Sequence, residues 1–445
     1  MCDTFIRNAG IQAAGQGRES SVALFGKNSD RHPDEPQMLF AGTADLNKWE
    51  GESDQALDKY TDGPLQALRR VYDQYEHPYR ALISKPIWMW GGEMGLNERG
   101  VAIGNEAVFS KWRSRRSRDL NEGLLGMDLL RLALHNAASA RGAVEFISRT
   151  IEREGQGGDG AYKGHLYYDN SFLICDARQA FILETAGHRW AVKQVTSDAI
   201  SNSYTLLDDF ESCDQITSQA AFRPEAGGGP QSSMFSFAGN NENRLYRWIT
   251  KGHIRRRRAR QLIDSEKFTL ASAFQLLRDH NGHRHPRKGM RNICMHSGAV
   301  VKSETTASMV VEFQMDGPIA WITGAPHPCV SLFQPWSFDA LPSDEEAGDT
   351  YSEHLLALGP VFQDYQQGEE YSRNMMALTR KFTANFSQFE HLLQPERDRI
   401  ERELMEIVSE AIAGGSSDKL GTAIGECRHR AYEYLKKAEE VAVNG

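Results

Sequence analysis

The stretch that decides the fold is CDTFI at residues 2–6, together with SVALFGKNSD at residues 21–30. The first stretch predicts a short strand that starts at a cysteine, and residues 21–26 predict a second strand. The glycines at 10 and 17 bound the turn expected between them. A hairpin of these strands brings Asp30 back beside residue 2. The sequence therefore predicts a carboxylate next to a cysteine at the start of the chain.

Cys2 combines the two groups that a self-contained nucleophile needs. A small second residue lets methionine aminopeptidase remove Met1, which gives Cys2 both a thiol and a free α-amine. The ordinary pKa of a thiol is about 8.5 and that of an α-amine is about 7.7–8.0, so the amine can accept the thiol proton near neutral pH. Since the thiolate is the reactive form, we predict Cys2 as the nucleophile. The alternative is that Cys2 is simply a small residue near a terminus.

Several segments resemble the secernins and C69 dipeptidases, which are N-terminal-nucleophile (Ntn) hydrolases. The likeness rests on MCDTF at 1–5 and LFGKNSDR at 24–31, then on ISKPIWMWGGEMG at 83–95, LNERGVAIGNEA at 96–107, GLLGMDLLRL at 123–132 and AISNSY at 199–204. It runs in order over roughly residues 2–340. The resemblance implies an α+β fold, the αββα four-layer sandwich of Ntn hydrolases. It also implies hydrolysis of an amide bond in a small peptide through a thioester acyl-enzyme on Cys2.

The resemblance implies catalytic roles for further side chains. Asp30 would orient the α-amine, and Asn202 would hold either the oxyanion or the amine. Asn105 or Glu106 would supply a second polar group, with the register open by one or two positions.

One arginine would also approach the nucleophile. We assign Arg256 to this role, with Arg255 and Arg244 as alternatives.

The substrate side of the site is predicted to contain Lys27, Trp90, Glu106 and His296. Lys27 stands where the relatives carry arginine, so the charge is kept but the bidentate fork is lost. Trp90 would form an apolar wall, with core packing as an equal alternative. His296, in CMHSG at 294–298, matches the secernin-like pattern.

Potential metal ligands gather in one later region of the chain. They are Asp279, His280, His283, His285, Cys294 and His296. No combination of them has a typical zinc spacing, so the sequence predicts no metal site and no cofactor.

The composition excludes several classes of protein. The 445 residues include 51 basic and 60 acidic ones, a net charge of −9, whereas nucleic-acid-binding domains are usually basic. The arginine-rich run at 253–260 is therefore interpreted as a solvated helix face. No apolar run approaches the length of a membrane span. The six cysteines contain no CxxC pair, which fits a reducing compartment, so we expect a cytoplasmic protein.

Charge also divides the chain. Residues 341–445 contain 11 basic and 20 acidic residues, so the first 340 residues have no net charge. We predict an Ntn catalytic domain at 1–340 and an acidic helical C-terminal extension at 341–445. The acidic extension and the run Arg255–Arg258 suggest a homo-oligomer held by complementary charge. The expected partner is a small peptide or amide substrate, with neither nucleic acid nor membrane.

Two other functions stay open on the sequence. One is an amidase or acyltransferase acting on a non-peptide amide or specialised metabolite. The other is a catalytically weak, secernin-like regulatory or interaction protein, against which the presence of both Cys2 and Asp30 counts.

Overall fold

The computed structural model describes most of the chain, namely residues 2–7, 22–52, 62–111, 123–221, 235–298, 301–338, 359–414 and 417–444. The turn predicted between residues 10 and 17 lies outside these ranges. The sequence also predicts a helix at 353–358 and a loop or lid at 207–240. The helix and the glycine-rich centre of the lid lie outside the described ranges as well.

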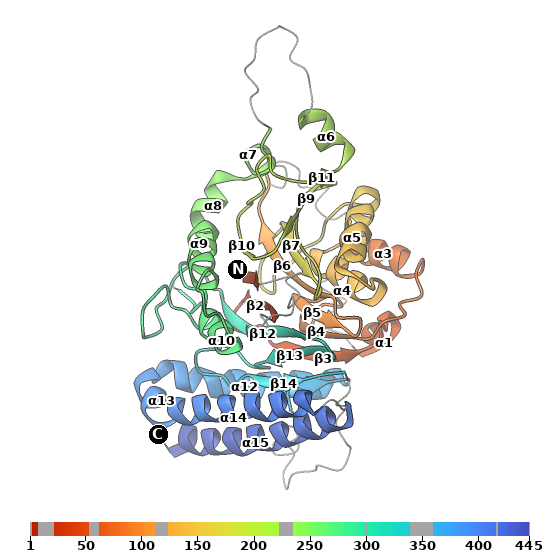
Figure 1. Ribbon diagram of the computed structural model, residues 1–445. Helices are drawn as coiled ribbons and strands as arrows, with labels where there is room; N and C mark the ends of the chain where they lie inside the picture. Colours follow the sequence, from red (N-terminus) through yellow and green to blue (C-terminus); the bar gives the residue numbers. More distant parts are fainter. Residues whose placement is uncertain are drawn as a thin grey trace.

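Two sheets pack face to face in the centre of the molecule (Figure 1). The six-stranded sheet has the order β10 (Asp198–Ser201), β1 (Cys2–Arg7), β2 (Ala23–Arg31), β12 (Glu304–Gln314), β13 (Gly317–Ile322) and β14 (Gln334–Trp336). The nine-stranded sheet has the order β11 (Ser212–Cys213), β9 (Arg189–Val195), β8 (Ala180–Ala186), β7 (Asp169–Cys175), β6 (Ala102–Val108), β5 (Met94–Asn97), β4 (Ala81–Pro86), β3 (Gln37–Gly42) and β15 (Val361–Phe362). Side chains from both sheets, such as Phe25, Leu82 and Met309, form a buried apolar layer between them.

Helices cover the outer face of each sheet. Helices α4 (Gly126–Asn136) and α5 (Ala140–Glu154) pack on the nine-stranded sheet. Helices α9 (Gly252–Ile263) and α10 (Leu270–Leu277) pack on the six-stranded sheet (Figure 1). The layers therefore run helix, sheet, sheet, helix, which confirms the expected α+β four-layer sandwich.

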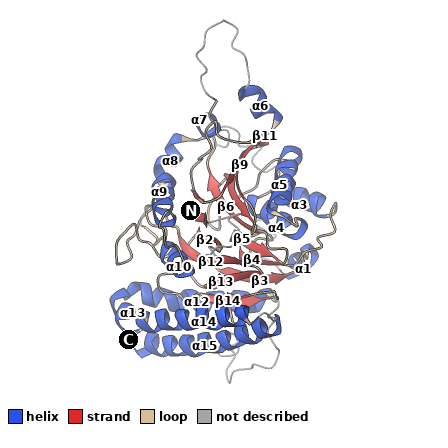
Figure 2. Cartoon of the chain, viewed as in Figure 1, coloured by secondary structure: helices blue, strands red, loops and turns tan. Residues whose placement is uncertain are grey.

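The C-terminal part forms a layer of helices along one end of the sandwich (Figure 2). It contains α12 (Tyr365–Ala384), α13 (Phe386–Leu392), α14 (Gln394–Ala413) and α15 (Ser417–Asn444). This layer contacts the sheets: α12 packs against β3 and α15 against β14. A buried ion pair, 2.5 Å between Arg278 and Glu401, joins the two parts. The expected helical extension is confirmed, whereas its separation at residue 340 as a domain stays a prediction.

The hairpin predicted at the chain's start is present. Strand β1 pairs antiparallel with β2, with Cys2 opposite Ser29, and its other edge pairs with β10, where Asp3 lies opposite Ser201. Hydrogen bonds on both edges make β1 an internal strand, so Cys2 is held at a defined position at the rim of the sheet.

The smaller elements differ partly from expectation. The sequence pattern of residues 243–262 predicts a single basic helix, but the structure has two helices there, α8 (Arg244–Thr250) and α9. Lys251 has a left-handed backbone conformation (φ 53°), which ends the first helix. The charged segment at 45–80 contains α1 (Leu46–Glu52) and α3 (Asp62–Tyr72), and the lid region contains α6 (Gln215–Ala221) and α7 (Phe237–Asn241). Among the described residues, no helix is long and apolar enough to cross a bilayer.

Candidate active site

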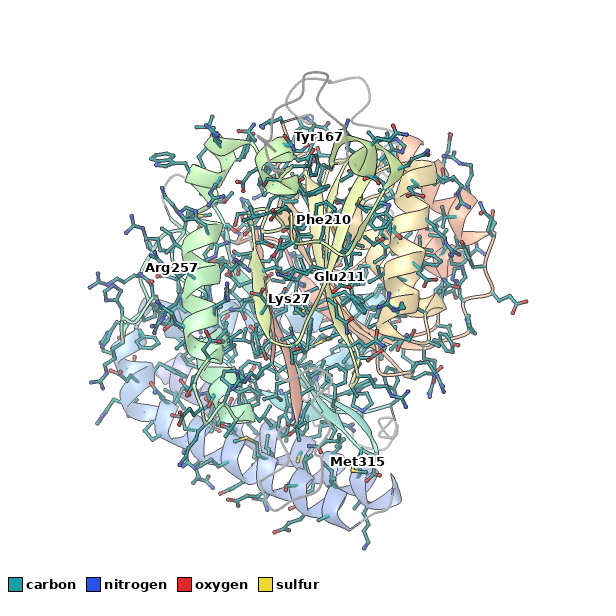
Figure 3. The ribbon with its side chains drawn as sticks, turned by 45° about the horizontal axis from the view of Figure 1, so that its top comes forward. Lys27, Tyr167, Phe210, Glu211, Arg257 and Met315 are labelled. Atoms are coloured by element: carbon teal, nitrogen blue, oxygen red, sulfur yellow. The ribbon has the colours of Figure 1, made fainter. Side chains whose placement is uncertain are left out.

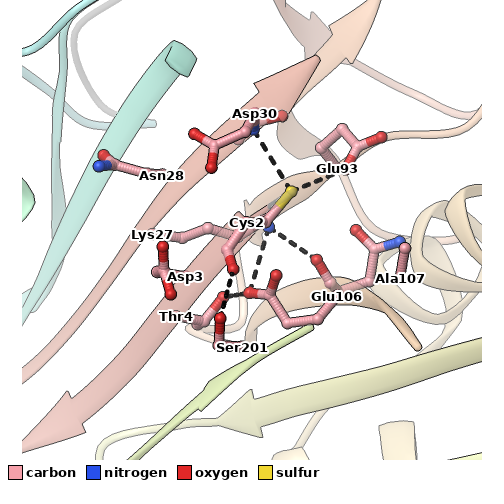
Figure 4. A network of polar contacts seen from close by, with 12 residues as sticks. Cys2, Asp3, Thr4, Lys27, Asn28, Asp30, Glu93, Glu106, Ala107 and Ser201 are labelled. Carbon is pink, nitrogen blue, oxygen red and sulfur yellow. Dashed lines mark hydrogen bonds and ion pairs between the residues drawn. The ribbon is translucent and has the colours of Figure 1, made fainter. Parts of the chain in front are cut away.

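Cys2 is the first residue of β1, and its thiol contacts Asp30 on β2 and Glu93 in the loop before β5. The backbone N–H of Asp30 donates to its Sγ over 3.3 Å, and Sγ lies 3.9 Å from Glu93 Oε2 (Figure 4). Only 4% of Cys2 is exposed. The thiol thus has one donor and one acceptor in place, which suits a group that must lose a proton and become negative.

The backbone nitrogen of Cys2 donates to Asn202 Oδ1 over 2.8 Å. The same oxygen accepts a bond of 2.6 Å from Arg255 Nη2, and Asn202 Nδ2 donates to the Ala107 carbonyl over 2.9 Å. Two donors on one side and an acceptor on the other fix which end of the amide is the oxygen. Asn202 therefore presents an acceptor to the nitrogen of Cys2. Of the two predicted roles, the geometry favours holding the amine over holding the oxyanion.

Arg255 is the arginine that serves this site, and the assignment of Arg256 is wrong. Arg255 is fully buried and pairs with Asp3 Oδ2 over 2.8 Å, besides its bonds to Asn202 and Ser201. Its Nη1 donates to the carbonyls of Thr250 and Met290. The guanidinium group of Arg255 therefore joins β1, the end of β10 and the helical layer.

Arg256 lies one position further along α9 and faces another direction. It bonds Asp198, at the edge strand β10, over 3.0 and 3.1 Å and is partly exposed. Neighbouring helix positions differ by about 100° around the axis, so only one of the two reaches the nucleophile. Arg244 is the first residue of α8, away from this network. Because Arg258 also pairs with Asp279, most of the arginine run is neutralised within the chain.

The electrostatics keep the thiol protonated at rest. Burial raises the pKa of Cys2 to about 12, against the lowering effect of the nearby Lys27 ammonium. A thiol with such a pKa needs a base that takes its proton during attack. The backbone nitrogen of Cys2 is the nitrogen on the same residue that the sequence analysis predicts as this base.

Lys27 lies beneath the nucleophile. Its side chain is fully buried, and Nζ donates to the Asn105 carbonyl over 2.7 Å and pairs with Glu106 over 3.4 Å. Burial acts to lower the pKa of Lys27, but Cys2, Glu106 and Glu93 together raise it above its ordinary value. Figure 3 shows Lys27 near the middle of the molecule, whereas Arg257 lies at its edge.

A glycine makes room for this lysine. A Cβ on Gly104 would lie 2.6 Å from Lys27 Cδ, so any other residue there would collide with it. Lys27 is therefore a buried cation between the two sheets, and its predicted contact with substrate stays a prediction.

Glu106 is likewise buried, and its predicted contact with substrate stays a prediction. It accepts a short hydrogen bond from the Thr4 hydroxyl and is fully buried (Figure 4). Burial raises the pKa of Glu106 to about 8, with Lys27 opposing the rise. Glu106 Oε1 thus lies 3.4 Å from Lys27 Nζ between the two sheets, and its charge depends on pH near neutrality.

Asn105 and Glu106 point to opposite faces of β6, as successive strand residues do. Asn105 Nδ2 donates to Asn170 Oδ1 on the neighbouring β7 over 2.9 Å. Its backbone carbonyl rather than its side chain contacts Lys27. The Asn105 Oδ1 atom is buried and has no hydrogen-bond partner among the described residues, which leaves it available as an acceptor.

Asp30 lies where the hairpin was expected to place it. Its backbone contacts the thiol, and its Oδ1 accepts a 2.6 Å hydrogen bond from the Thr305 hydroxyl on β12. Burial raises the pKa of Asp30 to about 7, and the Thr305 hydroxyl opposes the rise. Asp30 therefore titrates near neutral pH, in the range where the amine of Cys2 would also titrate.

Two further predicted substrate residues lie elsewhere. Trp90 is fully buried, with the Arg131 guanidinium 4.4 Å from its ring, so the core-packing alternative is right for Trp90. His296 is buried beside His280, with 3.2 Å between the Nε2 atoms, and belongs to a separate cluster. Neither residue contacts Cys2.

Four charged residues at the site were not predicted. Glu93 accepts from the thiol and pairs with Arg31 over 3.1 Å, while Arg31 in turn bonds Glu35 over 2.6 Å. Asp3 anchors Arg255. One feature of the sequence could have indicated two of them. Glu93 and Asp3 are acids inside otherwise apolar or glycine-rich stretches, where burying a charge is unfavourable unless it is paired.

Comparison with known proteins finds likeness among solved structures. The penicillin V acylase of Agrobacterium tumefaciens covers 78% of this chain and 89% of its own, with 13% identity and a TM-score of 0.39. A mutant of the conjugated bile acid hydrolase of Clostridium perfringens covers 76% and 97%, with 11% identity and a TM-score of 0.38. The N-acylethanolamine-hydrolyzing acid amidase ortholog of Caenorhabditis elegans covers 70% and 92%, with 11% identity and a TM-score of 0.34. No protein-family model matches the sequence, so the resemblance to secernins and C69 dipeptidases stays a prediction.

Proposed function

We propose that this chain is an Ntn hydrolase that cleaves amide bonds with Cys2, exposed by removal of Met1. One observation carries the proposal: the nitrogen of Cys2 lies 2.8 Å from Asn202 Oδ1, which Arg255 fixes from the other side. Any buried backbone N–H at this position would use one acceptor, but here the acceptor is also held by a buried arginine. An acceptor fixed in this way suits an α-amine, because its hydrogens must be directed so that its lone pair faces the thiol.

The reaction follows from these positions. The α-amine takes the proton from Sγ, and Sγ attacks the amide carbonyl. The carbon–nitrogen bond breaks, the amine returns the proton to the leaving nitrogen, and a thioester remains on Cys2. Water, deprotonated by the same α-amine, then attacks the thioester carbonyl. The carbon–sulfur bond breaks, the acid leaves, and the amine returns its proton to Sγ.

The surrounding charges support the step in which sulfur becomes negative. The Asp30 N–H at 3.3 Å donates directly to sulfur, and the buried Lys27 ammonium adds a positive field from below. In a dry site such fixed groups act more strongly than they would in water. Glu93, itself neutralised by Arg31, offers the thiol proton an acceptor before the substrate binds.

Small peptides, and dipeptides first among them, are the substrates we propose. This choice rests on the resemblance of the N-terminal segments to the C69 dipeptidases. An amidase or acyltransferase acting on a non-peptide amide uses the same thioester and is the alternative. The two differ in their products, since only the first releases free amino acids from dipeptides.

A panel of dipeptides and simple N-acyl amides tests the proposal. The wild-type chain should release amine from at least one class, and Cys2→Ser should lower that rate at least about a hundredfold. Cys213→Ser, a matched change at a half-buried cysteine outside the site, should keep the wild-type rate. An unaltered rate in Cys2→Ser would refute the mechanism.

A further inference from the structure

A second cluster of reactive side chains lies outside the active site. It consists of His280, Cys294, His296 and Cys329, all of them buried. Each offers one ligand atom, and these four atoms lie within 4.8 Å of one another. His280 follows α10, Cys294 and His296 precede β12, and Cys329 lies between β13 and β14. The fold thus brings two thiols and two imidazoles from three separate segments to one point.

The three distances from His296 Nε2 to the other ligand atoms match the edges of a metal tetrahedron. With metal–sulfur bonds of about 2.3 Å and metal–nitrogen bonds of about 2.05 Å, ideal edges are about 3.3 Å between nitrogens and about 3.6 Å between sulfur and nitrogen. The His280 and His296 Nε2 atoms are 3.2 Å apart. His296 Nε2 is 3.5 Å from the sulfur of Cys294 and 3.5 Å from that of Cys329.

Hydrogen bonds alone do not explain this arrangement. A neutral imidazole nitrogen carries either one proton or one lone pair, so it can serve one partner well. Here three partners converge on His296 Nε2 at nearly equal distance. A cation at the centre satisfies all four atoms at once.

We propose that these four residues bind one zinc ion in a closed, structural Cys2His2 site. Two thiolates and two neutral imidazoles are a common structural zinc set, and all four tetrahedral positions are filled by protein. Two thiolates also neutralise a divalent cation, so the complex can be buried without net charge.

The surroundings hold the ligands in place. The backbone N–H groups of Ile293 and Cys294 both donate to the Asp279 carbonyl, which fixes the turn that carries the first thiol. The His327 ring stacks on His296 with 4.5 Å between centroids, and Arg397 donates to the Cys329 carbonyl. Such outer contacts orient ligands and are a regular feature of metal sites.

The site lies one residue from a contact to the nucleophile's hairpin. Met295, between two of the ligands, exchanges hydrogen bonds with Thr305 through N–H to Oγ1 (2.9 Å) and through its carbonyl (3.0 Å). The Thr305 hydroxyl then donates to Asp30. Zinc would therefore hold the segment that positions Asp30, without touching substrate.

Metal analysis of the full-length chain tests the proposal. Protein purified without chelators, or reconstituted with zinc and desalted, should contain about one zinc per chain by mass spectrometry, and cobalt in its place should show the absorption of a tetrahedral thiolate complex. The double variant C294S/C329S should lose at least about nine-tenths of the metal. Cys213→Ser should retain all of it. Absence of zinc from the reconstituted wild type, or full retention in the double variant, overturns the proposal.

A measurement on the wild type alone covers the case in which the double variant does not fold. Cys294 and Cys329 should resist alkylation in the native chain and react after a strong chelator removes the zinc, with peptide mapping as the readout. A Cys294–Cys329 disulfide in metal-free, freshly purified protein would also overturn the proposal.

Discussion

Replacing Arg255 by lysine tests the central network, and Arg256→Lys is its matched control one residue away. Arg255 is buried and makes five hydrogen bonds of 2.6–3.0 Å, to Asp3, Ser201, Asn202 and two carbonyls. Lysine has three donors on one atom, so at least two bonds are lost. At about 1.5–3 kcal/mol for each bond to a charged group, the free energy of unfolding should fall by about 3–6 kcal/mol.

Arg256→Lys should behave differently. It keeps its charge beside Asp198 in a partly exposed pair, which is worth about 0–1 kcal/mol. Urea unfolding followed by circular dichroism measures both variants, and amide turnover should fall only in Arg255→Lys, because Asn202 loses its support. Equal destabilisation of the two variants, or a larger effect at Arg256, would refute the account of the site.

Two further predictions concern buried charges. Lys27→Met leaves Glu106 without its partner and should lower the free energy of unfolding by about 3–5 kcal/mol. Adding Glu106→Gln to Lys27→Met should restore part of that free energy, and a double variant less stable than Lys27→Met would contradict the prediction. Because burial raises the pKa of Asp30 to about 7, its contribution favours the fold at low pH and is lost as pH rises through 7. The free energy of unfolding of Asp30→Asn should therefore rise relative to that of the wild type by on the order of 2 kcal/mol between pH 5 and pH 8. A difference between the two proteins that stays constant over this pH range would contradict the prediction.

The hairpin and the positions of Cys2 and Asp30 could be predicted because they rest on local patterns, whereas Asn202 was predicted from the family resemblance alone. Short apolar strands with a glycine-bounded turn predict antiparallel pairing, and the pairing alone places Asp30 beside Cys2. The sequence could not show whether Arg255 or Arg256 approaches Cys2. Adjacent residues of a helix point in different directions, and the packing of α9 decides which of the two faces the sheet.

Two other features could not be predicted, for different physical reasons. The resemblance suggested Lys27 and Glu106 as substrate contacts, but the burial of both depends on their pairing between the two sheets, which no local pattern shows. The histidine and cysteine cluster escaped prediction because its fourth member, Cys329, lies 33 residues beyond His296. Only the packing of the segment between β13 and β14 brings Cys329 to the others.

Intact-mass analysis of the purified chain after incubation with a thiol-reactive acyl donor tests the central claim most directly. The claim predicts loss of Met1 and one acyl group on Cys2, located by peptide mapping and absent in Cys2→Ser. A chain that retains Met1, or an acyl group that stays on the Cys2→Ser variant through another cysteine, would contradict it.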